Sequence, residues 1–330
     1  MNRKTKICIG ILAACIVLLL GGASYYLVSG MQRETLPGYT EPAAGTETGR
    51  KDDSISYNGK NYVYNDSLKN ILFMGVDKQG EIQLSDMPGR GGQTDSLMLF
   101  VLNKEEKTFF VLQISRDTMV TVDIYDLSGK YYTSQESQLS LQYAYGNGER
   151  RSCWLTKEKV SELLYGLPID GYLAMNISGI GLLNDAVGGV TLTVPEDYTD
   201  IDEAFAKGAS VTLNGALAEK YVRSRDTETF ASNEQRMERQ KQYVEAFLKQ
   251  ARQRFSENEN FVSDMISRMD SYLVTDLTAE QLKEYSAYTH LEGEDTVLPG
   301  ENTQGEVYDE YRVDDEKLYG LLIKLFYKEI

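Results

Sequence analysis

Residues 96–114 read SLMLFVLNKEEKTFFVLQI, two apolar runs of strand length separated by the polar segment 103–107. Near-continuous apolar runs of this length are typical of strands buried on both faces of a sheet. The short polar connection predicts a hairpin between them. A third apolar run, residues 70–76 (NILFMGV), precedes this pair. Together the three runs predict a central sheet with helices on both faces.

Helical patterns follow these strands along the chain. Residues 157–165 have helical spacing and end just before a Gly-Leu-Pro terminator. Asn214 stands where it can cap a helix that continues through Tyr221. Residues 232–255 form the longest helical stretch, with an apolar stripe at offsets of three, four and seven. Strands interleaved with helices predict an α/β fold: a three-layer α-β-α domain with a central mixed sheet.

The N-terminus carries a membrane signal. Residues 7–28 contain no charged residue, and as a helix of about 1.5 Å per residue they would span a hydrocarbon core of about 30 Å. Basic side chains in residues 1–6 favour a cytoplasmic tip. The rest of the chain would then lie outside the cell, on a single-pass transmembrane helix in the cell membrane. A cleavable signal peptide, or lipoprotein processing at Cys15, is the alternative interpretation.

Composition divides the rest of the chain. Residues 29–56 lack hydrophobic periodicity, which predicts a flexible linker and an extracellular domain over 57–330.

With 34 Lys and Arg against 50 Asp and Glu, the net charge of −16 excludes a general nucleic-acid-binding protein. The segment 292–316 holds ten acids and one Arg, which favours a solvated loop. A single histidine argues against His-based metal sites and Ser-His or Cys-His catalysis.

Residues 223–254 reverse the charge, with eight Lys or Arg against five Asp or Glu. Arg223 and Arg225 are two residues apart, so an extended backbone would point both side chains the same way. The helix predicted over 232–255 carries a polar stripe roughly opposite its apolar one. The stripe consists of Arg236, Arg239, Gln240 and Tyr243. A local basic patch is what a polyanion site requires, although a solvated helix face also explains these charges.

Charged residues also lie at the ends of the predicted strands. Asp77 directly follows the run 70–76, and Asp95 directly precedes the run 96–102. Two carboxylates at strand ends can hold Mg²⁺ against a pyrophosphate, but on spacing alone two strand-terminal turn residues are the simpler interpretation. Arg116 follows the run 108–114, where its fork suits bidentate phosphate binding. A surface ion pair between Arg116 and Asp117 is the alternative.

A series of short motifs in fixed order resembles one known family. The motifs are NILFMGVD (70–77), QTDS (93–96), ISRDT (114–118), QYAYG (142–146), LYGLPID (164–170), LNDAVGGV (183–190), LNG through RSR (213–225) and RMERQ (236–240). Over residues 68–255 this ordered set resembles the LytR-CpsA-Psr family, which leaves 256–330 as a C-terminal extension. Members of that family are outward-facing enzymes. They transfer a glycopolymer, such as teichoic acid or capsular polysaccharide, from a polyprenyl-pyrophosphate carrier to peptidoglycan through a phosphodiester bond.

The resemblance implies roles for individual residues. Asp77 and Asp95 would hold Mg²⁺, or Mn²⁺, at the pyrophosphate, and one of them would be the base for the acceptor hydroxyl. The pyrophosphate would be bound by Arg90, Arg116, Arg223, Arg225, Arg236, Arg239 and Gln240, with Arg116 and Arg225 also catalytic. Apolar segments around 177–187 and 244–248 would line a tunnel for the prenyl tail, although core packing is the simpler role for each residue.

Two positions depart from the family pattern. The family usually has Arg where Gln93 stands and Lys where Gln138 stands, so two cations are lost unless Arg90 replaces one of them. Three functions therefore stay open: a membrane-anchored, Mg²⁺-dependent phosphotransferase, a non-catalytic envelope protein that binds lipid-linked polymer or regulates envelope assembly, and a polyprenyl-pyrophosphate hydrolase in which water replaces the sugar hydroxyl.

Overall fold

The computed structural model describes residues 54–330 except 226–231, 259–260, 286–287, 292 and 307. The predicted cytoplasmic tip, the predicted anchor at 7–28 and nearly all of the predicted linker lie outside this part of the chain. Among the described residues, no helix is both long enough and apolar enough to cross a membrane. Strand β1 (Ile55–Tyr57) pairs with β2 (Lys60–Tyr64), so regular structure begins inside the predicted linker.

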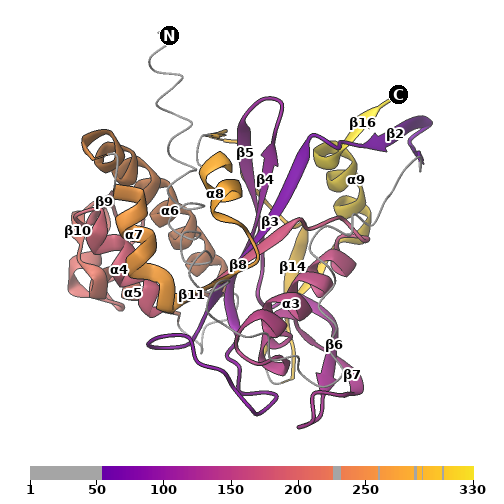
Figure 1. Ribbon diagram of the computed structural model, residues 1–330, viewed down its shortest axis with the longest axis horizontal. Coiled ribbons are helices and arrows are strands. Elements are labelled where there is room, and N and C mark those ends of the chain that lie inside the picture. The colour runs from indigo at the N-terminus through magenta and orange to yellow at the C-terminus, as the bar shows by residue number, and fades with distance from the viewer. Residues whose placement is uncertain (1–53, 226–231, 259–260, 286–287, 292, 307) are drawn as a thin grey trace.

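A seven-stranded mixed sheet forms the centre of the fold (Figure 1). Its strand order is β11-β8-β3-β4-β5-β12, and β13 also pairs with β5. The strands are β3 (Leu68–Val76), β4 (Thr94–Asn103), β5 (Thr108–Ile114), β8 (Gly171–Asn176), β11 (Leu273–Thr275), β12 (Thr289–His290) and β13 (Thr296–Val297). β3, β4 and β5 are antiparallel neighbours, whereas β8 runs parallel to β3. The three predicted strands and the predicted mixed sheet are confirmed.

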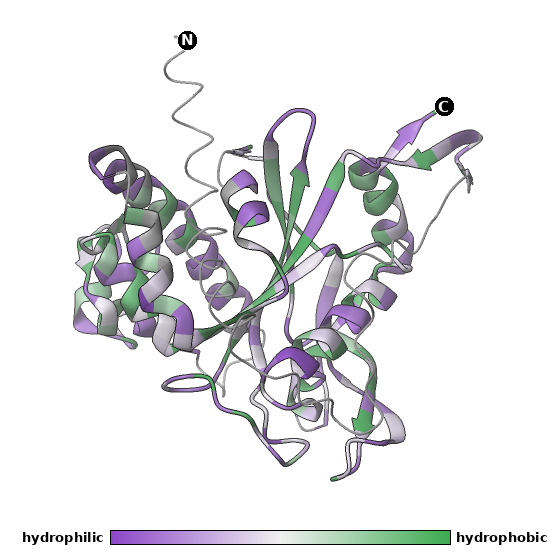
Figure 2. Ribbon diagram, in the orientation of Figure 1, coloured by the Kyte–Doolittle hydropathy of each residue, from purple (hydrophilic) through white to green (hydrophobic). Residues whose placement is uncertain are grey.

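Helices cover both faces of this sheet, and Figure 2 shows the hydrophobic strands between them. Strands that are apolar on both faces must be covered on both sides. Successive side chains of a strand point to opposite faces, so Ile71 and Leu72 of β3 belong to different core clusters. The first cluster includes residues of α4 (Ser178–Ala186), α5 (Gly215–Arg223), α6 (Ser232–Glu257), α7 (Phe261–Met269) and α8 (Ala279–Tyr285). The second includes residues of α3 (Arg150–Leu163) and α9 (Asp315–Phe326).

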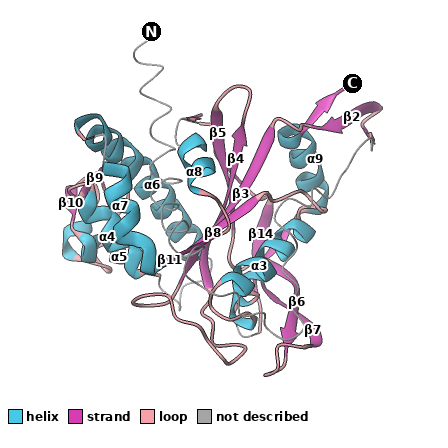
Figure 3. Cartoon of the chain, in the orientation of Figure 1, coloured by secondary structure: helices cyan, strands magenta, loops and turns pink. Residues whose placement is uncertain are grey.

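Smaller sheets surround this core (Figure 3). They pair β1 and β2 with β16 (Tyr327–Glu329), β6 (Met119–Tyr125) with β7 (Tyr131–Gln138), β9 (Val190–Thr193) with β10 (Ser210–Leu213), and β14 (Gly300–Gln304) with β15 (Asp309–Val313). Short 3₁₀ turns occupy Leu139–Leu141, Tyr143–Tyr145, Glu203–Phe205 and Asp270–Tyr272.

The acidic segment 292–316 is not the predicted solvated loop. It contains β13, the hairpin of β14 and β15, and the first residues of α9. Tyr311 of β15 is only 7% exposed and fixes the hairpin to the domain. A high acid content predicts that a segment has an exposed face, but it does not exclude a strand whose other face is buried.

The N-cap of α5 offers a test of local stability. The Asn214 side chain accepts a hydrogen bond of 2.9 Å from the backbone N–H of Leu217. Replacing Asn214 with Ala removes this acceptor, so we expect the free energy of unfolding to fall by about 1 kcal/mol. Urea unfolding of the two proteins measures the difference. Asn214→Asp keeps an acceptor oxygen and should stay near the wild type; equal losses in both variants would contradict the capping role.

Candidate active site

An apolar cavity lies between the central sheet and helices α4 to α6. It has an empty volume of about 910 Å³, including its open mouth. Its lining includes Phe73, Met98, Phe100, Met175, Ile177, Ile180, Leu183, Tyr243, Val244 and Phe247. Both apolar segments predicted to line a tunnel, around 177–187 and 244–248, therefore contribute side chains. Asp95, Arg223, Arg236 and Gln240 also reach the cavity, so an anionic group attached to an apolar chain would meet cations here.

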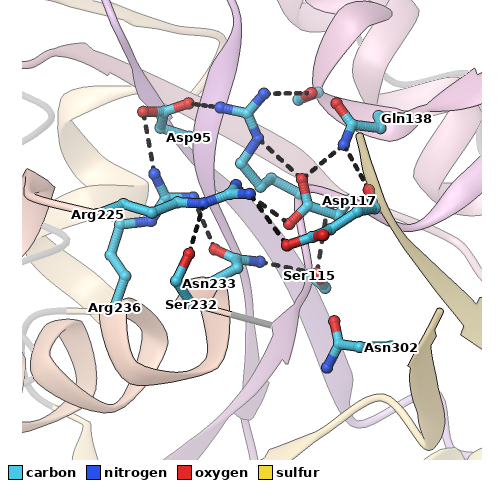
Figure 4. Close-up of polar contacts among 12 residues, drawn as sticks. Asp95, Ser115, Asp117, Gln138, Arg225, Ser232, Asn233, Arg236 and Asn302 are labelled. Atoms are coloured by element: carbon cyan, nitrogen blue, oxygen red, sulfur yellow. Dashed lines mark hydrogen bonds and ion pairs between the residues drawn. The ribbon is translucent and has the colours of Figure 1, made fainter. Parts of the chain in front are cut away.

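A chain of alternating charges begins beside this cavity (Figure 4). Arg236, near the start of α6, places its Nη1 3.3 Å from Oδ2 of Asp95, at the start of β4. The other Asp95 oxygen, Oδ1, pairs with Nη1 of Arg116. Arg116 follows β5, the antiparallel neighbour of β4, and this pairing brings the end of one strand to the start of the other. Asp95 thus lies between two guanidinium groups.

The chain of charges continues away from the cavity. The Arg116 Nε lies 3.4 Å from Oδ1 of Asp117, and Nη1 of Arg225 lies 3.5 Å from Oδ2 of the same carboxylate. Arg225 then places its Nη2 3.4 Å from Oδ2 of Asp309, on β15. The order is Arg236, Asp95, Arg116, Asp117, Arg225 and Asp309, three cations and three anions. We call this set the charge chain.

Burial changes the pKa of two members of the charge chain, Arg236 and Asp117. Arg236 is 3% exposed, and burial lowers its pKa to about 10, although Asp95 acts in the opposite direction. It therefore remains a cation at neutral pH. Its Nε is buried and has no hydrogen-bond partner among the described residues. Burial also raises the pKa of Asp117, which is fully buried, against the influence of Arg116 and Arg225. Such costly buried charges are typical of functional sites.

Neutral side chains hold two arginines of the charge chain, Arg236 and Arg225. Nη2 of Arg236 donates to Oδ1 of Asn233 at 2.7 Å, and the Asn233 amide donates to Oγ of Ser115 at 3.0 Å. Nε of Arg225 donates to Oγ of Ser232 at 3.1 Å. These contacts fix both guanidinium planes, as Figure 4 shows. A guanidinium group fixed in this way is prepared to bind phosphate oxygens.

The two glutamines that depart from the family pattern also take part. Oε1 of Gln93 accepts a hydrogen bond of 2.8 Å from Nη2 of Arg116. Nε2 of Gln138 donates to Oδ1 of Asp117 at 2.8 Å and to the backbone oxygen of Asp309 at 2.9 Å. Each glutamine thus orients a charged residue of the site. The exposed Arg90 has no described contact with the charge chain, within the part of the chain that the structure covers.

Two predicted pyrophosphate-binding residues instead bond backbone carbonyls at the end of α5. Arg239 donates from Nε to the oxygen of Tyr221 at 2.8 Å, and its guanidinium also donates to the oxygen of Ser224. Gln240 donates from Nε2 to the oxygen of Val222 at 3.1 Å, although Gln240 also lines the cavity. Through these hydrogen bonds, Arg239 positions the backbone just before Arg225.

Two expectations about geometry were wrong. Arg223 does not lie on an extended backbone, because it is the last residue of α5; its side chain is 48% exposed and pairs with Glu219 at 3.5 Å. The polar stripe of α6 is not opposite the buried face either, since its four members are all 8% exposed or less. The carbonyls that end α5 and the carboxylate of Asp95 supply partners that make this polar burial possible.

Asp77 lies at the end of β3, next to the start of β4. Its Oδ1 accepts a hydrogen bond of 2.6 Å from the backbone N–H of Gln93. Across the two strands, Val76 pairs with Thr94, with an irregular register beside it. Asp77 and Asp95 therefore lie close together, where β3 ends and the neighbouring strand β4 begins. Among the described residues, no group of three or more His, Cys, Asp or Glu could hold a metal ion.

The motifs do not include Asp309, and the sequence offers Asp117 only as a surface partner of Arg116. The sequence contains one signal for Asp309. Asp309, Tyr311 and Val313 alternate with the charged residues Glu310 and Arg312. In a strand this alternation places Asp309 on the same face as the buried Tyr311. No comparable signal reveals that Asp117 is fully buried.

Comparisons with known proteins agree with this architecture. Among sequence relatives, the polyisoprenyl-teichoic acid–peptidoglycan teichoic acid transferase TagU of Bacillus cereus (strain AH820) is 27% identical over 280 residues, 84% of this chain and 82% of that protein. TagU of Halalkalibacterium halodurans is 25% identical over 76% of this chain and 73% of that protein.

Solved structures show the same fold. Protein gbs0355 of Streptococcus agalactiae superposes with a TM-score of 0.62 at 22% identity, covering 78% of this chain and 86% of that one. TagV of B. subtilis gives 0.58 at 24% identity, covering 79% and 96%. The sequence model of the LytR_cpsA_psr family matches residues 38–323, most of the chain. This protein therefore belongs to the LytR-CpsA-Psr family.

Proposed function

We propose that the protein transfers a glycopolymer from a polyprenyl-pyrophosphate carrier to peptidoglycan through a phosphodiester bond. The observation that carries this proposal is the apolar cavity whose lining also includes Asp95, Arg223 and Arg236. An apolar slot suits a prenyl chain, and the adjoining guanidinium groups suit its pyrophosphate. Relatives named as teichoic acid transferases support the same reaction class.

The proposed reaction is a displacement at phosphorus. The oxygen of an acceptor hydroxyl forms a bond to the phosphorus that carries the polymer. The bond from that phosphorus to the bridging oxygen breaks, so polyprenyl phosphate leaves with the electron pair. The proton of the hydroxyl passes to a carboxylate, Asp77 or Asp95. Arg116, Arg225 and Arg236 stabilise the charge that develops on the leaving phosphate.

The two aspartates fit a divalent cation. Mg²⁺ is usually bound through one or two carboxylates together with substrate phosphates and water, so a pair of Asp residues is a sufficient protein contribution. Within the described structure, Oδ1 of Asp77 accepts a hydrogen bond, and both oxygens of Asp95 form ion pairs. Oδ2 of Asp77 has no described partner. Asp77 and Asp95 would hold Mg²⁺ or Mn²⁺, which would neutralise charge on the pyrophosphate.

The predicted anchor gives this reaction its location. If residues 7–28 cross the cell membrane and the domain lies outside, the site is confined near the bilayer that holds the lipid carrier. Tethering of this kind raises the effective concentration of the enzyme at its substrate. Membrane, lipid-linked polymer and peptidoglycan are thus the proposed partners.

One reconstitution experiment separates the three functions. The full chain in liposomes is incubated with a lipid-pyrophosphate-linked saccharide, peptidoglycan oligomers and Mg²⁺. We expect saccharide attached to peptidoglycan and carrier phosphate released in equal amounts, and EDTA should stop both. Carrier phosphate released without attachment would indicate a hydrolase. Binding of the lipid-linked saccharide without turnover would indicate a non-catalytic binding protein.

Gln93 offers a second test, because the family usually has Arg there. We expect that Gln93→Arg does not raise transfer but lowers kcat at least about fivefold, an effect of about 1 kcal/mol. The physical reason is that the substitution replaces the acceptor of Arg116 with a second cation beside it. Gln83→Arg, the same change at an exposed position in the same loop, should have no effect. A higher kcat in Gln93→Arg would show that a missing cation limits the enzyme.

A further inference from the structure

The carboxylate at the end of the charge chain comes from outside the region that the family motifs cover. Asp309 lies on β15, beyond the last motif but inside the stretch that the family model matches, and its Oδ2 is 3.4 Å from Nη2 of Arg225. Its side chain is only 14% exposed. The β14–β15 hairpin therefore reaches the candidate active site.

Backbone contacts fix this hairpin to the same segments that form the site. The N–H of Tyr311 donates to the oxygen of Asp117 at 2.8 Å, and Tyr311 forms a parallel bridge with Thr118. On the other side, Gln138 donates from Nε2 to the oxygen of Asp309 at 2.9 Å. The position of the Asp309 carboxylate is thus set by segments that also place Asp117.

Among the residues that the structure describes, Arg225 consequently has one partner for each of its three guanidinium nitrogens. Nε donates to Ser232, Nη1 faces Asp117 and Nη2 faces Asp309. A guanidinium group carries five N–H donors, so these three contacts fix its plane, and within the described residues two donors have no described partner. Without Asp309, Nη2 loses its anionic partner and the plane can tilt.

From these contacts we infer that Asp309 is a positioning residue for transfer, acting through Arg225. This inference rests on the proposed function, because the role of Arg225 is to stabilise charge on the leaving phosphate. An arginine held in one plane before the substrate binds needs no reorganisation as that charge develops. Asp309 repels the pyrophosphate itself, so it does not act by binding the substrate.

The kinetic test compares Asp309→Asn with Glu310→Gln in the full chain in liposomes. Glu310 is next to Asp309 on β15, faces away from it, and pairs with Arg312 at 2.6 Å. We expect Asp309→Asn to lower kcat about tenfold without raising the KM for the lipid-linked saccharide, and Glu310→Gln to match the wild type. An unchanged kcat, or a raised KM as the main effect, would overturn the proposal.

A double-mutant cycle tests whether Asp309 acts through Arg225. If it does, Asp309→Asn should change kcat less than about twofold when Arg225 is already Lys. A full tenfold loss in that background would show an independent effect and overturn the positioning role. Thermal unfolding of each variant separates a loss of folded protein from a loss of rate.

A spectroscopic test is independent of activity. In the wild type, the fixed guanidinium of Arg225 should give slowly exchanging, separate ¹⁵Nη signals, assigned by their loss in Arg225→Lys. Asp309→Asn should merge them, whereas Glu310→Gln should not. Merged signals already present in the wild type would overturn the proposal. If the wild type transfers no saccharide but keeps separate signals that Asp309→Asn merges, the proposed function fails while the fixed geometry of Arg225 stands.

Discussion

Replacing Asp95 with Asn should lower transfer about 10³-fold and leave the domain folded. Asp95 pairs with both Arg116 and Arg236, and it is one of the two carboxylates proposed to accept the proton and to hold the metal ion. Loss of a general base or of a fixed charge at a reaction centre typically costs 10²- to 10⁴-fold. The measurement is kcat for transfer of a lipid-linked saccharide to peptidoglycan oligomers.

A matched control distinguishes this effect from a general change in charge. Asp86 is exposed in the loop between β3 and β4, so Asp86→Asn should keep full activity. Asn retains the size of Asp, and we therefore expect thermal unfolding of Asp95→Asn to stay a single cooperative transition. Full activity of a folded Asp95→Asn protein would show that the active site has been assigned to the wrong residues.

Filling the apolar cavity should block only substrates with a long prenyl chain. Val244 of α6 lines the cavity and lies at the border of the first core cluster, so a Trp at this position would extend into the cavity. We expect Val244→Trp to lower kcat/KM about 100-fold for a long-chain carrier, a loss of about 3 kcal/mol. The Val244→Trp variant should use a soluble short-chain substrate as efficiently as the wild type does.

Two comparisons make this prediction specific. Val244→Ala enlarges the cavity and should keep most of the activity on the long-chain carrier. Competition between long-chain and short-chain substrates measures the change in selectivity directly. If Val244→Trp lowers transfer from both substrates equally, the cavity does not hold the prenyl chain and the loss reflects damage to the domain.

The sequence was sufficient for the three central strands β3, β4 and β5, because a run of apolar residues is a local signal, but it did not predict β8, β11, β12 or β13. The runs 70–76, 96–102 and 108–114 are nearly continuous apolar stretches, interrupted only by single small or polar residues, and this pattern is typical of strands buried on both faces. The N-cap at Asn214 was predictable for the same reason, since its bond reaches only three residues along the chain. Local chemistry decides both features.

The site was predictable only in part. Asp95, Arg116, Arg225 and Arg236 were identified from motifs and lie together, but spacing could not show that Arg239 bonds the carbonyls of Tyr221 and Ser224. Likewise, the acidic composition of 292–316 concealed a strand whose Asp309 faces Arg225. Which charges are buried depends on partners far away in the chain, and composition carries no information about those partners.

The sheet edge at β5 has a consequence for how the protein reaches its final state. Thr289 and Thr296 pair with Thr108 and Leu112, so the strands that cover this edge are made long after β5 itself. Until then, the growing chain presents an apolar strand with unpaired backbone groups, which favours association with other chains. Folding that depends on such distant contacts is slow. Assistance by a chaperone should therefore matter most before β12 and β13 have paired with β5.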